Sequence, residues 1–363
     1  MSAATELEHV FKDIGVPRLD ERFLALKKSL VQEKDKEKVI ASYERLLHVL
    51  KSEIAHIEKF GPSLVLEIDF KEVQRNVRGR GCVILRNVVS EEQAKCWEAS
   101  LKDYTCRHPA VGGHPQSSPA AWNLFETPAQ VQMRSHLAVM AAMVSVSRLG
   151  HAHPPVLIDF DSQVFPLAPH LDSGAIERWE DEINRKDFDA IFQVKWEDWD
   201  DWAADFRVNA KTDLYQTGIS CSTWRSLQGW LSLSQTGTGE GSLRVLPSLK
   251  ASVAYIMLRP LFHTGEFDDS LPTFPGATSG NTQFIPMADH HPHLNIERAV
   301  VGIPPVRPGD YVFWHCDLVH SVDRMNLGQN ASSACYNACN PLKLHNAVTR
   351  VYSGGFSKGR RAN

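Results

Sequence analysis

The residues His170-Leu171-Asp172 have side chains and a spacing suited to binding a metal ion. Alternate side chains of an extended strand point to the same face, so His170 and Asp172 would point one way and Leu171 the other. An imidazole beside a carboxylate supplies two ligands of a 2-His-1-carboxylate site, which holds non-haem Fe(II) and leaves coordination positions open. Without a third ligand, a hydrogen-bonded His–Asp pair at a strand end explains the motif equally well.

The third ligand has several candidates, because seven histidines follow Asp172: His263, His290, His291, His293, His315, His320 and His345. Three of these histidines cluster between residues 290 and 293 beside a proline, and such clustering favours a solvated loop. His315 and His320 are five residues apart, so on one regular strand they would face opposite sides. Only one of these two histidines could then point inward, and the spacing does not say which.

The segments around these residues predict short strands joined by Gly- and Pro-rich turns. We expect strands at residues 65–70, 81–85, 155–160, 228–234 and 242–247, and an apolar strand segment within 306–323. The strands at 228–234 and 242–247 are predicted to form a hairpin around a turn at 236–241. Many short strands with such turns are typical of an antiparallel β-sandwich or jelly roll.

Helices are expected at the start of the chain and beside the strands. Apolar residues recur at three- and four-residue steps over residues 5–60, which predicts two or three amphipathic helices with a break near 32–38. Further helices are expected from the capping residue Ser90 to Tyr104 and over 131–148. The division expected is a helical region at 1–62 packed on a core domain at 63–363, with insertions at about 177–222 and 253–295.

Residues 177–207 form an unusual insertion with 11 acidic and 5 basic side chains and four tryptophans. Disordered acidic segments contain few aromatic residues, so this composition predicts a folded segment. We expect it to cover a site, with Trp179, Trp196, Trp199 and Trp202 over an apolar pocket. A peripheral helical elaboration is the alternative interpretation.

The overall composition excludes several classes of protein. A formal net charge of −4 offers no basic excess for binding nucleic acid. The sequence contains no run of about 18 apolar residues, so no membrane-spanning helix is expected. Its first residues lack the basic start and apolar run of a secretory signal, so no such signal is expected. The seven scattered cysteines are expected to be free thiols in a reducing compartment, so we expect a cytoplasmic protein.

Several segments resemble a known group of enzymes. Pro308-Gly309-Asp310, a hydrophobic strand and then His320 resemble the second half of phytanoyl-CoA-dioxygenase-like Fe(II)/2-oxoglutarate oxygenases, in which a Gly-Asp turn precedes the distal His ligand. A closer resemblance is to the YbiU-like branch of that superfamily, a domain of unknown function in fungi and bacteria. It is carried by PHLDSGAIERWED, WRSLQGWLSLSQTGTGEGSLRVLP, RPGDYVFWHCDLVHSV and SSACYNACNP, within roughly residues 65–350.

This resemblance implies a mainly β fold with helices (α+β) around a double-stranded β-helix, a jelly roll of the cupin-like kind. It implies that His170, Asp172 and His320 bind Fe(II), with 2-oxoglutarate as cosubstrate and O₂ as oxidant. The implied reaction oxidises an unactivated C–H bond of a small metabolite such as an amino acid or a secondary-metabolite intermediate. Hydroxylation is the default outcome, and desaturation or cyclisation needs only a different fate of the substrate radical.

One departure from the family pattern concerns the residue that binds the distal carboxylate of 2-oxoglutarate. Many relatives carry an arginine about eleven residues after the distal histidine, where this chain has Ala331. A guanidinium can donate two parallel hydrogen bonds to a carboxylate. We therefore expect Arg225 to replace it, with Ser332 adding a hydrogen bond.

Two further residues complete the expected cosubstrate site. Gln228 and Trp230 lie two apart on a predicted strand and would share its inward face. Arg324 and Arg244 are the next candidates for the carboxylate, and a surface ion pair is the alternative role for Arg225.

Two other functions stay open from the sequence. A cupin-like metalloenzyme could use the same ligands without 2-oxoglutarate, and the missing late arginine favours it. A non-catalytic jelly-roll binding protein would keep the three residues for structure alone. The identity of the substrate and the oligomeric state cannot be read from these residues.

Overall fold

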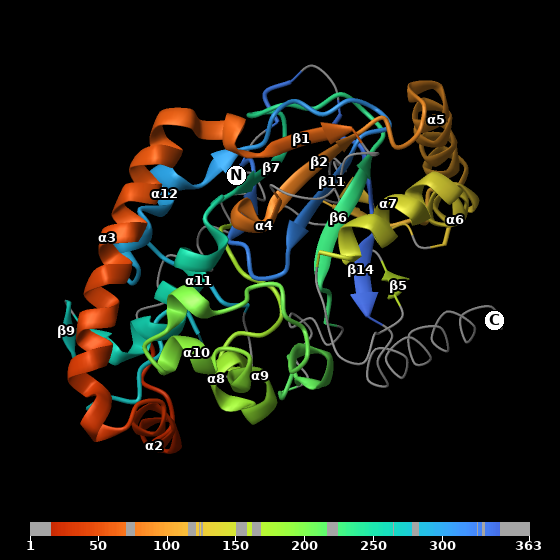
Figure 1. The fold of residues 1–363 in the computed structure, drawn as a ribbon. Coiled ribbons are helices and arrows are strands. Elements are labelled where there is room, and N and C mark those ends of the chain that lie inside the picture. Colours follow the sequence, from red (N-terminus) through yellow and green to blue (C-terminus); the bar gives the residue numbers. More distant parts are fainter. Residues whose placement is uncertain are drawn as a thin grey trace.

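The chain folds into two main sheets with helices packed around them (Figure 1). This computed structural model describes residues 16–69, 77–114, 121–122, 124, 126–149, 158–161, 168–215, 224–263, 265–277, 283–324, 326–328 and 331–341. The larger sheet has the order β1 (Leu66–Asp69), β2 (Cys82–Arg86), β11 (Tyr311–His315), β6 (Leu227–Ser232), β14 (Ala338–Pro341) and β5 (Ile158–Asp161). β13 (Ala334–Tyr336) also pairs with β6, and β1 runs parallel to β2 while the other pairs are antiparallel.

The central strands of this sheet are apolar on both faces because both faces are covered. All five residues of β11 are buried, as are the first four of β2. A sheet buried on both sides reads as a continuous apolar run, which explains the apolar segments at 81–85 and 311–314. These two predicted strands are confirmed, as are those near 66, 158 and 228.

The smaller sheet consists of β10 (Val301–Gly302), β7 (Leu243–Val245) and β12 (His320–Val322). The predicted hairpin is wrong, because β6 and β7 lie in different sheets. β6 already has partners on both edges, in β11 on one side and in β13 and β14 on the other. The chain therefore crosses from one sheet to the other at the turn 236–241. Two short hairpins, β3 (Gly113–His114) with β4 (Ala121–Trp122) and β8 (Phe262–His263) with β9 (Glu266–Phe267), lie apart from both sheets.

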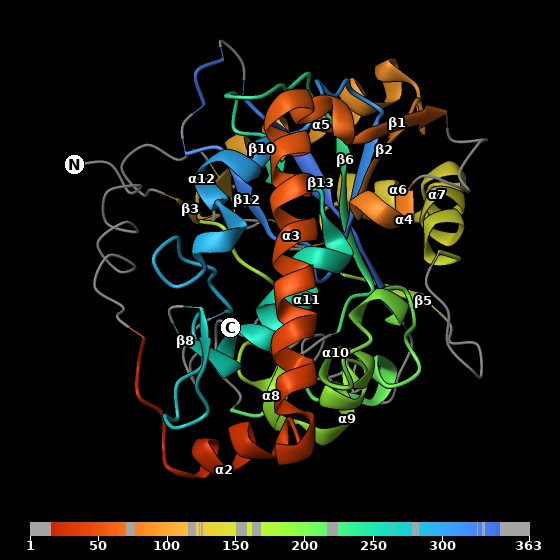
Figure 2. The same ribbon diagram turned by 60° about the vertical axis from the view of Figure 1, so that its left-hand side comes forward.

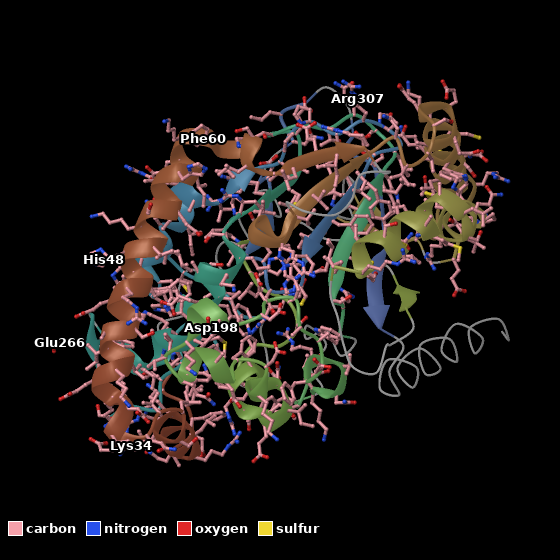
Figure 3. The ribbon with its side chains drawn as sticks, viewed as in Figure 1. Lys34, His48, Phe60, Asp198, Glu266 and Arg307 are labelled. Atoms are coloured by element: carbon pink, nitrogen blue, oxygen red, sulfur yellow. The ribbon has the colours of Figure 1, made fainter. Side chains whose placement is uncertain are left out.

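The N-terminal helices α2 (Arg22–Ser29) and α3 (Lys36–Phe60) form an outer layer. The 3₁₀ helix η1 (Glu33–Asp35) separates them at the predicted break, and η2 (Gly61–Leu64) follows α3. α3 crosses the molecule and packs on α11 (Leu249–Leu258) and α12 (Ile296–Ala299) (Figure 2). The exposed side chains of Lys34, His48 and Phe60 mark the outer edge of this layer (Figure 3). Residues 5–15 of the predicted helical region lie outside the described residues.

Another group of helices lies beside the larger sheet (Figure 1). They are α4 (Val77–Arg80), α5 (Glu91–Arg107), α6 (Pro128–Ser135) and α7 (Leu137–Ser147). Ser90 caps α5 as predicted, since its side chain accepts a hydrogen bond of 3.2 Å from the backbone N–H of Gln93. The predicted helix over 131–148 is divided at His136 into α6 and α7.

The side chains of the tryptophan-rich insertion are part of the hydrophobic core. It contains α8 (Glu177–Glu180), α9 (Glu182–Lys186), α10 (Asp189–Phe192), η4 (Trp196–Asp198) and η5 (Arg207–Asn209). Its four tryptophans are at most 5% exposed and belong to the same hydrophobic cluster as the sheets. The indole N–H of Trp179 donates to the Met257 carbonyl, and that of Trp199 to the Asp187 carbonyl. The peripheral interpretation is therefore wrong for these side chains, and the expected cover over a site stays a prediction.

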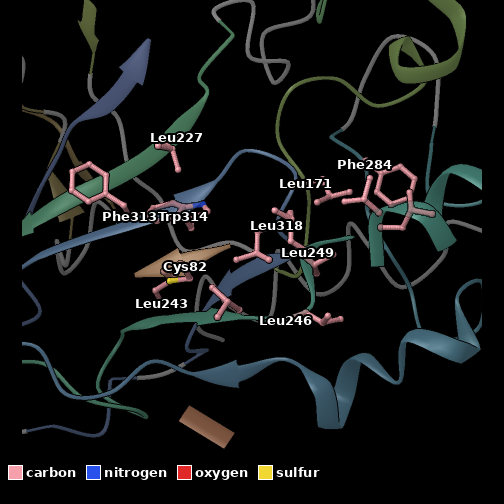
Figure 4. Close-up of a cluster of buried hydrophobic side chains, with 14 of the residues drawn as sticks. Cys82, Leu171, Leu227, Leu243, Leu246, Leu249, Phe284, Phe313, Trp314 and Leu318 are labelled. Atoms are coloured by element: carbon pink, nitrogen blue, oxygen red, sulfur yellow. The ribbon is translucent and has the colours of Figure 1, made fainter. Parts of the chain in front are cut away.

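The hydrophobic core reaches the segment that carries the candidate metal-binding motif. Leu171 is 1% exposed and lies among Leu249, Phe284 and Leu318 (Figure 4).

The predicted mixture of sheets and helices is confirmed. In the described ranges, strand pairing forms separate sheets and shows no closed jelly roll, so closure stays a prediction. None of the helices described is long and apolar enough to cross a membrane.

Candidate metal centre

Backbone hydrogen bonds place the His170 segment between two neighbours. The His170 N–H donates to the His320 carbonyl at 2.9 Å, and the His320 N–H donates back to His170 at 3.1 Å. On the other side, the Leu171 N–H donates to the Phe284 carbonyl at 3.0 Å. The motif is thus flanked by β12 and by residues 283–285, as one strand lies between two others.

This arrangement brings the side chains of His170, Asp172 and His320 together. Their ligand atoms all lie within 4.8 Å of one another. His170 Nε2 is 3.9 Å from Asp172 Oδ1, and His320 Nε2 is 3.5 Å from Asp172 Oδ2. The three residues are only 3%, 8% and 4% exposed. The predicted ligand set therefore converges from two separate parts of the chain.

The other ring nitrogens fix how the two imidazoles are protonated. His170 Nδ1 lies 2.6 Å from the Ala168 carbonyl, and His320 Nδ1 lies 2.8 Å from the Leu318 carbonyl. A carbonyl can only accept, so each Nδ1 carries the hydrogen and each Nε2 presents a lone pair. Among the described residues, His170 Nε2 is buried and has no hydrogen-bond partner. A buried lone pair without a donor fits a metal ligand.

Electrostatics keeps these groups in the protonation states that a cation needs. Burial lowers the pKa of His170 to about 4, and the neighbouring His320 adds to this effect. Burial alone would raise the pKa of Asp172, but the neighbouring His320, His170 and Arg225 hold it well below its usual range. Metal ligands must be deprotonated to bind, and near neutral pH His170 and Asp172 are in that state.

Two glutamines hold the carboxylate of Asp172. Gln228 donates from Nε2 to Asp172 Oδ2 at 2.5 Å, and Gln283 donates from Nε2 to Oδ1. The Tyr336 hydroxyl donates to Oε1 of Gln228, which orients its amide so that the NH₂ group faces Asp172. Sequence reasoning missed Gln283 and Tyr336. Gln283 reaches Asp172 because its neighbour Phe284 pairs with Leu171. These two segments are far apart in the sequence, so no local pattern predicts the contact.

Replacing Tyr336 by phenylalanine removes the hydroxyl that fixes this amide. Gln228 keeps its bond to Asp172, but its amide is no longer fixed at Oε1, so the carboxylate is held less firmly in the geometry that a cation needs. We expect Tyr336→Phe to weaken binding of Co(II) or Mn(II) by about tenfold, as for other residues that orient metal ligands. Isothermal titration calorimetry measures this effect, and Tyr311→Phe, which loses a buried hydroxyl bonded to the Asn337 carbonyl, is the control. Equal affinities in wild type and Tyr336→Phe would contradict the expectation.

Of the residues expected at the cosubstrate site, Arg225 and Trp230 lie beside Tyr336, whereas Ser332 does not. Arg225 is half-buried, with its guanidinium carbon 5.7 Å from the centre of the Tyr336 ring. Trp230 is half-buried and lies opposite Tyr336 in the pairing of β6 with β13. Ser332 is exposed and lies beyond the C-terminal end of β6, whereas Arg225 precedes the N-terminal end of that strand. The Oγ of Ser332 accepts a hydrogen bond of 3.3 Å from Thr236. The structure therefore does not bring Ser332 to the triad.

The alternative arginines lie in less suitable positions. Val245 pairs with His320, so its neighbour Arg244 points to the opposite face of the smaller sheet and donates to the Val300 carbonyl. Arg324 is exposed. Ala331 precedes β13 and is also exposed, so the position that carries arginine in many relatives does not face the triad here.

The other candidate histidines do not join the triad. A turn at 316–319 separates His315 on β11 from His320 on β12, so the assumption that both lie on one strand was wrong. The His315 ring packs edge-on against Trp202. The remaining candidates within the described ranges lie on β8 and around η7 (Pro292–Leu294): His263, His290, His291 and His293. His345 lies outside the described residues.

A second group, His315, Cys316 and Asp317, also has closely spaced ligand atoms. Its carboxylate is already compensated, because Asp317 accepts from Arg178 at 2.6 Å and from Arg207 at 2.8 Å. Burial raises the pKa of the Cys316 thiol to about 12, so it is not a thiolate. The group is a buried ion network and lacks the free lone pairs of a metal centre.

The fold and the site define a mixed helix-and-sheet protein with a buried 2-His-1-carboxylate constellation. The chain belongs to the Gig2-like family, whose match covers residues 17–353. The solved structure of GlcNAc Inducible Gene 2 protein from Candida albicans is 35% identical, with a TM-score of 0.81 over 92% of this chain and 79% of that chain.

Two bacterial relatives extend the comparison. An oxidoreductase candidate from Salmonella typhimurium LT2 is 25% identical, with a TM-score of 0.75 over 90% of this chain and 85% of that chain. YbiU from Escherichia coli strain K12, an uncharacterised protein, is 27% identical over 79% of this chain and 73% of its own length. The expected resemblance to YbiU is thus confirmed. Two α-ketoglutarate-dependent enzymes of nogalamycin biosynthesis, a carbocyclase and an epimerase, are similar at TM-scores of 0.42 and 0.36.

Proposed function

We propose that the chain is a non-haem Fe(II)- and 2-oxoglutarate-dependent oxygenase. The observation that carries this proposal is the buried convergence of two imidazole Nε2 atoms and one carboxylate, with both Nδ1 atoms held by carbonyls. Two nitrogens and one carboxylate are the ligand set of non-haem Fe(II) oxygenases, and three protein ligands leave positions open for cosubstrate and oxygen. Bound Fe(II) would supply the activation of O₂ that oxidation of a C–H bond requires.

The chain's own residues prepare this site. His170, Asp172 and His320 would hold the cation, and Gln228 with Gln283 would orient the carboxylate. Because the triad is at most 8% exposed, its surroundings exclude bulk water and strengthen electrostatic interactions there.

Arg225 is the residue we propose for the distal carboxylate of 2-oxoglutarate. Its guanidinium lies above the Tyr336 ring and is close enough to contribute to the lowered pKa of Asp172. Trp314 supports a polar ligand nearby, since its ring centre is 5.3 Å from that of His320 and it is only 3% exposed. Within the described part of the chain its indole N–H has no hydrogen-bond partner. A buried donor of this kind needs an acceptor, and a bound keto acid offers one.

The substrate we propose is a small metabolite such as an amino acid or a secondary-metabolite intermediate. The net charge of −4 gives no reason to expect a polyanion. Hydroxylation is the default outcome, with desaturation or cyclisation as variants of the same chemistry.

The test is anaerobic addition of Fe(II) and 2-oxoglutarate to the purified chain. We expect a visible charge-transfer band that needs both components, and release of succinate when oxygen is admitted. Metal binding without this band, together with turnover that needs no keto acid, would instead favour the cosubstrate-free metalloenzyme. If the chain binds no divalent metal at all, the proposal fails and a binding protein becomes the better interpretation.

A further inference from the structure

One buried guanidinium, that of Arg178, contacts both segments that carry the triad. It donates from Nη2 to the Asp172 carbonyl and from Nε to the Gly174 carbonyl at 3.1 Å, so it holds the backbone of the first segment. It donates from Nη1 to Asp317 Oδ1 at 2.6 Å, three residues before His320. Arg178 and Asp317 are each 1% exposed, so water does not replace these bonds.

The restraint that Arg178 places on Asp317 also acts on the His320 imidazole of the triad. Asp317 and Leu318 belong to the same turn between β11 and β12, and the Leu318 carbonyl is the group that holds His320 Nδ1. Fixing the Asp317 carboxylate therefore fixes the turn that orients the His320 ring. The Arg178 guanidinium thereby holds the Asp172 segment and the His320 segment in a fixed position relative to each other.

A neighbouring arginine provides a natural comparison. Arg207 is 2% exposed and pairs with the same Asp317 at 2.8 and 3.0 Å, and with Asp187 at 3.3 Å. Its hydrogen bonds in the described residues go to these carboxylates and to Cys316, and none goes to the His170–Asp172 segment. Both arginines share a carboxylate, but only Arg178 connects it to the triad.

Stability alone is a weak explanation for this network. Burying charges removes them from water, and well-packed apolar side chains of similar volume often serve stability as well or better. A planar guanidinium, in contrast, offers donors in fixed directions to several acceptors at once. We propose that Arg178 is a positioning residue that sets the separation of the two segments carrying the metal ligands. This inference rests on the proposed metal-dependent function.

The experiment compares Arg178→Met with Arg207→Met in the full chain. Each variant leaves Asp317 with one guanidinium and removes one buried charge, and Arg207→Met also leaves the buried Asp187 carboxylate without its partner, so the control loses at least as much charge pairing. Calorimetric titration with Co(II) or Mn(II) gives the Kd, the visible spectrum of bound Co(II) reports ligand geometry, and urea unfolding gives stability. We expect Arg178→Met to weaken metal binding by about ten- to 100-fold and to alter the Co(II) spectrum. Arg207→Met should stay within about threefold of wild type, with a comparable loss of stability.

A conservative variant covers the case in which Arg178→Met does not fold. Arg178→Lys keeps a positive charge for Asp317 but cannot also reach both carbonyls, so we expect a folded chain with about tenfold weaker metal binding. Equal losses of affinity in the Arg178 and Arg207 variants would overturn the specific role of Arg178, and so would wild-type affinity in both Arg178 variants. Absence of metal binding by the wild type would overturn the proposed function itself, which is a different result.

Discussion

The asparagine variants His170→Asn, Asp172→Asn and His320→Asn are each expected to lose metal binding by about 100-fold or more. Each histidine substitution removes a ligand nitrogen, and Asp172→Asn replaces an anionic ligand by a neutral amide oxygen, so we expect losses above the ten- to 100-fold effect of residues that only orient ligands. Asparagine is a suitable replacement for the histidines because its amide can still donate to the Ala168 or Leu318 carbonyl that now holds an imidazole. Equilibrium dialysis with Co(II) or anaerobic Fe(II) measures the affinity.

His315→Asn is the matched control for these variants. His315 is a buried histidine whose Nδ1 accepts from the Asp317 N–H at 3.1 Å, and the asparagine oxygen can accept in its place. Metal affinity should then change only about two- to threefold, since no ligand is removed. A large loss in His315→Asn with retention in His320→Asn would show that the wrong histidine has been assigned.

Removal of the Arg225 side chain is expected to raise the KM for 2-oxoglutarate by about 100-fold. A distal carboxylate left without its charged donor loses roughly 3 kcal/mol, which corresponds to that factor. Steady-state release of succinate at varied 2-oxoglutarate measures the effect, and Co(II) affinity without cosubstrate should stay nearly constant. Arg225→Lys should restore affinity only in part, because an ammonium cannot reproduce the two parallel bonds of a guanidinium.

Arg244→Ala serves as the comparison for this experiment. Arg244 is also half-buried, but it lies on the face of its strand opposite to His320. Its loss should leave the KM for 2-oxoglutarate unchanged. If Arg225→Ala kept the wild-type KM, the donor to the distal carboxylate would be another residue.

Local patterns in the sequence predicted the parts of the site that depend on spacing of two to ten residues. His170 and Asp172 could be paired because alternation along a strand is a local property. The helix capped by Ser90 and the end of α3 at Gly61 follow from the chemistry of single positions, and Gly61 has a φ of +51° that glycine tolerates. His320 was selected through the resemblance of its segment to a family pattern, because spacing alone could not decide between His315 and His320.

The missed features depend on contacts between distant parts of the chain. Gln283 and Arg178 meet the ligand-bearing segments only because of how the strands and the insertion pack. The predicted hairpin failed for the same reason, since alternation identifies a strand but not its partner. Composition predicted a folded insertion but could not show that its tryptophan rings pack in the main hydrophobic cluster. Tertiary structure decided each of these cases.

The two amides on Asp172 have a consequence for the order of folding and metallation. With both carboxylate oxygens already hydrogen-bonded, the metal-free chain leaves no uncompensated buried anion, so it can reach its native state before any cation arrives. Each carboxylate oxygen has two lone pairs, so a cation can bind Asp172 while both glutamines keep their hydrogen bonds, and metal uptake would need no rearrangement of these amides. Chelation would then return the chain to a folded apo form, in contrast to small zinc domains that unfold when their metal is removed.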